Sequence, residues 1–106
     1  MAKYLIQASY VGEGVKGLLK DGGTQRRASV EQMLKSVDGK MESFYFAFGD
    51  SDVFIVADLP DNATAAAIAL KVNAAGIVRC KTTVLMTPDE VDAATKMDVT
   101  YKPPGG

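Results

Sequence analysis

Two strand-like segments joined by a short polar turn constrain the fold of this chain more than any other part of its sequence. Lys40–Phe48 and Val53–Asp58 are rich in aromatic and β-branched residues, which favour strands. The residues between them, Gly49-Asp50-Ser51-Asp52, are of the types that tight hairpin turns favour. Strands joined this closely must be antiparallel, so every other element has to be placed around a hairpin.

The segment before the hairpin is predicted to contain a strand and two helices. Tyr4–Val11 carries polar residues at alternate positions, as a strand with one partly polar face does. The next apolar residues recur at helical spacing up to Gly22, which predicts a short helix. A second helix is predicted to begin after Thr24 as its N-cap and to end at Gly39 as its C′ residue.

The segment after the hairpin is predicted to contain a helix, a strand and a final helix. An alanine-rich helix covers about Ala63–Ala75, and the fourth strand covers Ile77–Met86. Thr87-Pro88-Asp89-Glu90 has the residues of a capping box with proline at the first helical position, which predicts a terminal helix to about Met97. The chain therefore divides into a domain over residues 1–98 and a Pro/Gly-rich tail over residues 99–106.

The predicted order of elements is βαββαβ followed by a C-terminal helix. This order is typical of the ferredoxin-like α+β fold, in which two split βαβ units share one hairpin. Right-handed crossovers then predict a four-stranded antiparallel sheet in the order 4-1-3-2, with the helices on one face. The other face of this sheet is left without a cover of its own.

Composition argues against several classes of partner and reaction. The net charge of -1 includes no basic excess, so we expect no binding to nucleic acid. No apolar run approaches the roughly 18 residues of a membrane span, so we expect no membrane partner. A lone cysteine and a first segment without a signal-peptide pattern favour a cytoplasmic protein. The chain has no histidine, the commonest metal ligand and general base, so we expect no cofactor and no metal.

Alternation along the strands predicts which side chains share the uncovered face. The polar residues of the first and fourth strands are expected to meet there: Gln7, Ser9, Arg79, Lys81 and Thr83. Phe44, Phe46 and Phe48 share one parity, and we expect them on the same face as the apolar core of an interface between two copies. An apolar wall for a flat ligand is the alternative.

Two further patterns suggest anion binding. Gly12-Glu13-Gly14-Val15-Lys16-Gly17 matches the dinucleotide-binding pattern, but a hairpin follows where that fold needs a parallel strand. A strand-to-helix turn is therefore the favoured interpretation, with an anion at the helix N-terminus left open. Arg26 and Arg27 can hold a carboxylate or phosphate, although solvated charges on a helix surface explain them as well.

Short motifs between about Tyr4 and Glu90 also carry a family resemblance. They are Tyr10, Glu13-Gly14, Lys16-Gly17, Arg27, Gly39-Lys40, Phe44, Phe48-Gly49, Asp52, Pro60-Asp61 and Gly76. This set resembles the bacterial GYD-domain proteins, although Ser51 stands where the family's Gly-x-Tyr-Asp motif has tyrosine. The resemblance implies a dimeric α/β barrel, formed by a homodimer or higher homo-oligomer. Relatives in the wider barrel group include cofactor-independent monooxygenases, haem-degrading enzymes and small-molecule-binding regulators.

Three functions are therefore considered. The favoured one is a homo-oligomeric module that binds a small organic or anionic molecule. The alternatives are a cofactor-independent enzyme, monooxygenase- or isomerase-like, and a structural or scaffolding subunit. No catalytic residues are assigned, and the candidate ligand-binding residues are Gln7, Ser9, Tyr10, Arg27, Phe46, Arg79 and Lys81.

Overall fold

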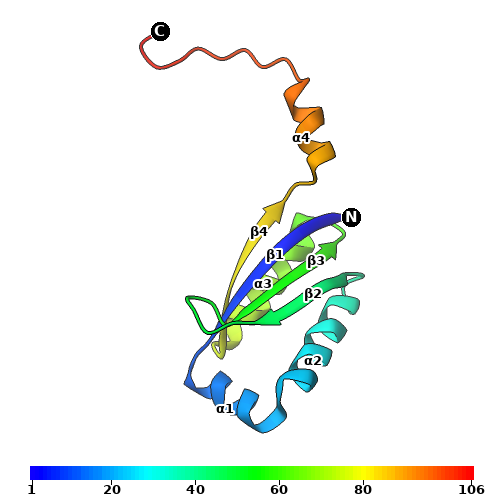
Figure 1. Cartoon of the computed structure of the whole chain (residues 1–106), viewed down its shortest axis with the longest axis vertical. Helices are drawn as coiled ribbons and strands as arrows, with labels where there is room; N and C mark the ends of the chain where they lie inside the picture. The colour runs from blue at the N-terminus through cyan, green and yellow to red at the C-terminus, as the bar shows by residue number, and fades with distance from the viewer.

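The fold is a single antiparallel sheet with helices packed on one face. The computed structural model of the chain describes residues 1–106. Its elements are β1 (Ala2–Tyr10), α1 (Gly12–Asp21), α2 (Gly23–Lys35), β2 (Lys40–Phe46), β3 (Val53–Leu59), α3 (Asn62–Ala75), β4 (Val78–Leu85) and α4 (Pro88–Thr95). The strands lie in the order β2-β3-β1-β4, which is the predicted order read from the other edge (Figure 1). This confirms the α+β fold.

The core lies between the sheet and the long helices α2 and α3. Every second residue of β3 is buried, and so is every second residue in the middle of β1, as alternation along a half-covered strand requires. Val30 and Leu34 of α2 and Ala65 and Ile68 of α3 belong to the same buried cluster. The remaining members of that cluster are Tyr4, Ile6, Ala8, Met41, Val53, Ile55, Ala57, Leu59 and Val78.

A bulge in β2 reverses the side-chain pattern that alternation predicted for this strand. The pairing of β2 with β3 shifts by one residue between Met41 and Ser43, which leaves Glu42 as the extra residue. Because side chains alternate with a period of two, this shift moves Phe44 and Phe46 to the helix-covered face. The prediction that these phenylalanines lie on the uncovered face was therefore wrong.

Other element boundaries also differ from the prediction. β2 ends at Phe46, so Phe48 lies exposed in the turn rather than on the sheet. Helix α2 begins one residue before Thr24, and its N-cap is Gly22, at a φ of 81°. Gly39 does not adopt a left-handed conformation; a Cβ there would lie 2.6 Å from a methyl carbon of Leu59, so close packing requires the glycine.

The first turn of α3 has a capping residue whose charge affects stability. Asp61 Oδ1 accepts hydrogen bonds from the backbone N–H and the hydroxyl of Thr64, both at 2.8 Å. Both hydrogen bonds hold the pKa of Asp61 below its ordinary value of 3.8, and the bond from the backbone N–H has the larger effect. Because the charged form is favoured in the folded state, its contribution is present above pH 3.8 and is lost as the pH falls through the lowered pKa.

Replacing Asp61 with alanine is expected to lower the melting temperature at neutral pH, because the amide of Thr64 loses its acceptor. The deficit should shrink in strongly acidic solution, where the wild-type carboxylate is protonated. Thermal unfolding at neutral pH and at about pH 2.5 measures both, with Asp61→Asn as a control that keeps a capping oxygen without the charge. An equal deficit at both pH values would contradict this prediction.

Residues 87–106, which we call the C-terminal arm, extend away from the domain (Figure 1). The predicted capping box is confirmed: Thr87 Oγ1 accepts from the Glu90 amide at 3.2 Å, and Glu90 Oε1 accepts from the Thr87 amide at 3.0 Å. No residue of α4 is buried. The arm raises the radius of gyration to 17.0 Å, against about 13 Å for a compact domain of this size. None of the helices has the length and hydropathy that a bilayer crossing requires.

Candidate functional site

Four of the predicted site residues lie together on the uncovered face of the sheet. In the pairing of β1 with β4, Gln7 lies opposite Lys81 and Ser9 lies opposite Arg79. Side chains of directly paired residues project from the same face, so alternation predicted this grouping correctly. Arg79 and Lys81 are exposed, while Gln7 and Ser9 are half-buried.

A polar hollow of about 720 Å³ surrounds this group at the end of the sheet next to the β2–β3 turn. Gln7 Nε2 donates to Ser51 Oγ at 3.4 Å, and Ser9 Oγ donates to the Asp50 carbonyl at 3.3 Å. Ser51 is itself buried, so the turn is held against β1. The residues that line the hollow are Gln7, Ser9, Val11, Asp50, Ser51, Asn73, Gly76, Arg79, Cys80 and Lys81.

The positive charges of the uncovered face are matched at one end and unmatched at the other. Lys3 pairs with Glu42 and, at 2.9 Å, with Asp58. Both hydrogen bonds raise the pKa of Lys3 above its ordinary value, and the bond to Glu42 has the larger effect. Arg79 and Lys81 form no ion pair. Besides the two ion pairs of Lys3, the chain has one more, which joins Lys16 to Glu13. The hollow therefore combines neutral hydrogen-bonding groups and the carboxylate of Asp50 with two cations that form no ion pair.

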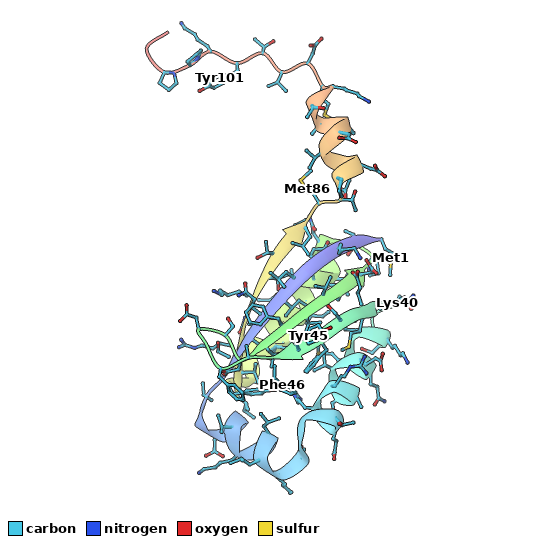
Figure 2. All side chains as sticks on the ribbon, viewed as in Figure 1. Met1, Lys40, Tyr45, Phe46, Met86 and Tyr101 are labelled. Carbon is cyan, nitrogen blue, oxygen red and sulfur yellow. The ribbon has the colours of Figure 1, made fainter.

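Beside the hollow, the middle of the uncovered face is apolar and aromatic. One row across the sheet runs from Tyr45 through Phe54 and Gln7 to Lys81. The next row contains Ser43, Val56, Leu5 and Thr83. The side chain of Tyr45 projects from this face (Figure 2) and the residue is 69% exposed. The uncovered face thus presents an aromatic surface next to a cationic one.

The other predicted site residues do not join this group. Tyr10 and Phe46 lie on the helix-covered side, where Tyr10 contacts the α1 region and Phe46 lies over Gly23 at the start of α2. Arg27 is exposed on α2 and lines none of the four main cavities. Its neighbour Arg26 lines a helix-side cavity instead.

Sequence reasoning considered Arg26 together with Arg27 as an anion-binding residue but kept only Arg27 among the candidate site residues, although a signal that favours Arg26 was present. Arg26 lies four residues before Val30 and eight before Leu34, both of which are buried. Residues at this spacing share one face of a helix. The periodicity that predicted α2 therefore also directs Arg26, and not Arg27, toward the sheet.

A lone cysteine and a glycine-rich segment both have structural explanations. Burial raises the pKa of the Cys80 thiol, only partly opposed by a hydrogen bond with Asn73, so the thiol is less prone to ionise. In the glycine-rich segment, a Cβ on Gly14 would lie 2.7 Å from the Ile77 carbonyl oxygen. That glycine lets α1 pack against the segment that enters β4, which supports the strand-to-helix turn. No cluster of three potential metal ligands is present.

Comparison with known proteins gives one match. The sequence profile of the GYD domain family matches residues 4–95 of the 106-residue chain. No curated protein and no solved structure matches this chain. The matched segment begins within β1, covers all the later strands and helices and ends with α4. On this match and the fold described above, the chain belongs to the GYD domain family.

Proposed function

We propose that the protein is a homo-oligomeric module that binds a small anionic molecule on the uncovered face of its sheet. The observation that carries this proposal is the placement of Arg79 and Lys81, neither of which forms an ion pair, beside Gln7 and Ser9. An arginine offers paired donors in a fixed plane, and a lysine adds a mobile charge. Gln7 supplies a neutral donor that orients the ligand, since the hydrogen bond to Ser51 uses only one of its two amide N–H groups.

The same face is the surface on which a second copy would pack. Leu5, Tyr45, Phe54 and Val56 form an apolar area that no helix of the chain covers. Exposed patches of this kind commonly mark protein association. Two such sheets facing one another would bury the aromatic rows and place each hollow at the edge of the interface. The ligand would then be partly enclosed by the partner copy.

A cofactor-independent enzyme of the barrel group remains the alternative. Such a reaction needs a general base in or near the hollow. Burial raises the pKa of the Cys80 thiol, which lines the hollow, and so disfavours the thiolate that could act as a base or nucleophile. Binding without catalysis is therefore the function that the residues around the hollow support best.

A thermal-shift screen with small carboxylates and phosphate esters tests the proposed function. At least one member should raise the melting temperature of the wild type, since a ligand that binds only the folded state stabilises it. The Arg79→Gln/Lys81→Gln variant should need at least about tenfold more ligand for the same shift, because charge-assisted hydrogen bonds are lost.

Lys20→Gln/Lys71→Gln is the matched control, because it removes the same charge from exposed helix positions outside the hollow. It should respond to the ligand as the wild type does. Equal losses in the two double variants would show a general charge effect and would contradict the proposed site. The absence of any stabilising anion for the wild type would contradict it as well.

A further inference from the structure

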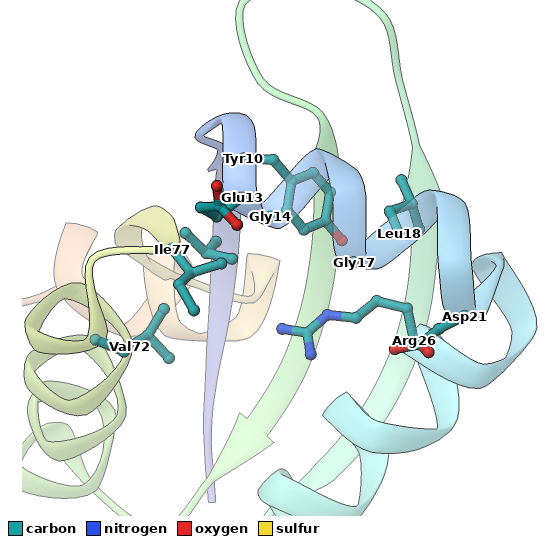
Figure 3. Close-up of a pocket in the computed structure, with 11 residues that line it drawn as sticks. Tyr10, Glu13, Gly14, Gly17, Leu18, Asp21, Arg26, Val72 and Ile77 are labelled. Carbon is teal, nitrogen blue, oxygen red and sulfur yellow. The ribbon is translucent and has the colours of Figure 1, made fainter.

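A second cavity, of about 340 Å³, lies on the helix-covered side of the sheet (Figure 3). Its walls come from α1, the start of α2, the end of α3 and the first residues of β4. It shares no lining residue with the polar hollow. The lining residues are Tyr10, Glu13, Gly14, Gly17, Leu18, Asp21, Arg26, Val72, Ala75, Ile77 and Val78.

Arg26 is the one cationic side chain in this cavity. It is half-buried, and its guanidinium points between Tyr10 and Ile77 (Figure 3). Glu13 and Asp21 also line the cavity, but neither forms an ion pair with it. A guanidinium stays charged at any physiological pH, and removing it from water without a counter-charge is unfavourable. The cavity is therefore suited to an anion that pairs with Arg26.

The remaining lining restricts which anion fits. Leu18, Val72, Ile77 and Val78 give the cavity apolar walls, which favour a hydrocarbon or aromatic body. The carboxylates of Glu13 and Asp21 repel any anion in the cavity, so a ligand can carry only the one negative charge that pairs directly with Arg26. The volume is at the small end of the range of about 300–1,000 Å³ for ligand sites.

We infer that this cavity binds a small apolar carboxylic acid as its monoanion. The carboxylate pairs with the guanidinium of Arg26, which presents two parallel N–H donors to a planar anion. The hydrocarbon body lies against Leu18, Val72 and Ile77, and Tyr10 forms the opposite wall. This site is additional to the one proposed on the uncovered face, and each can fail without the other.

Gly17 offers a way to close the cavity without disturbing the core. It lines the cavity, and a Cβ built on it meets no heavy atom within 4 Å. Because Gly17 lines the cavity, we expect a leucine side chain at this position to occupy part of the space that the ligand needs. Gly12 on the same helix also has no atom within 4 Å of an added Cβ, but it does not line the cavity, so Gly12→Leu is the matched control.

Calorimetric titration with 2-naphthoate and its uncharged amide tests this inference. Wild-type protein should bind naphthoate at least about tenfold more tightly than the amide, since only the anion pairs with Arg26. Arg26→Gln should remove that preference. Arg27→Gln loses the same charge at the adjacent exposed position and should keep the preference. Gly17→Leu should abolish binding of both probes, whereas Gly12→Leu should not.

The outcomes separate this cavity from the polar hollow. Arg79→Gln/Lys81→Gln should bind naphthoate with wild-type affinity, because neither residue lines the cavity. If that variant loses naphthoate while Arg26→Gln retains it, the acid binds the uncovered face and the inference is wrong. Equal affinity of wild type and Arg26→Gln, or no naphthoate binding by the wild type, would overturn it too.

Discussion

Replacing Phe54 with aspartate is expected to convert the protein from a dimer to a monomer at micromolar concentration. Phe54 lies in the middle of the uncovered face, between Tyr45 of β2 and Gln7 of β1. In the proposed oligomer its ring packs against the partner sheet. A carboxylate at this position would be buried in the dimer without a counter-charge. The free-energy cost of burying it is expected to exceed what the other contacts of the interface contribute. Sedimentation equilibrium measures the mass directly.

Leu70→Asp is the control for this experiment. Leu70 is 72% exposed on α3, which packs on the opposite side of the sheet, so the same change there should leave the dimer intact. Both variants should keep the wild-type circular dichroism spectrum. A wild type that is monomeric at micromolar concentration would exclude the facing-sheet arrangement, and so would a dimeric Phe54→Asp variant.

Replacing Leu34 with alanine is expected to destabilise the domain by about 2–5 kcal/mol, the usual range for a large-to-small change in a core. Leu34 is completely buried where α2 packs on the sheet. Its removal leaves a cavity that neighbouring side chains can fill only in part. Since small domains are stable by about 5–15 kcal/mol in total, this loss is large. Urea unfolding at a fixed protein concentration measures it, because oligomer stability depends on concentration.

Leu19→Ala makes the same chemical change at an exposed position. Leu19 is 81% exposed on α1, so its truncation should change the unfolding free energy by no more than about 0.5 kcal/mol. Similar losses for both variants would mean that α2 does not pack on the sheet as described. A loss confined to Leu34→Ala confirms that α2 is a core element.

The sequence was sufficient to predict the strand order and the faces of β1 and β4. Both strands are regular, so a period of two places Gln7, Ser9, Arg79 and Lys81 together without any knowledge of tertiary contacts. The hairpin and the helices around it leave few ways to arrange the sheet. Local turn chemistry also predicted the cap at Thr87.

The face of β2 could not be predicted in the same way. A single extra residue at Glu42 reverses the parity of all later positions, and nothing in its residue type distinguishes a bulge from a regular strand. For this reason Phe46 was expected at an interface and instead lies over the start of α2. The cavity around Arg26 was also beyond prediction, because its walls come from segments far apart in sequence.

Native mass spectrometry tests the central claim, that the uncovered face binds both a second copy and a small anion. The wild type and the Arg79→Gln/Lys81→Gln variant are each incubated with the most stabilising anion from the thermal-shift screen. We expect both proteins as dimers, because the aromatic rows are unchanged, with the anion retained by the wild type alone. A wild type that is monomeric, or a variant that retains the anion as fully as the wild type does, would contradict the claim.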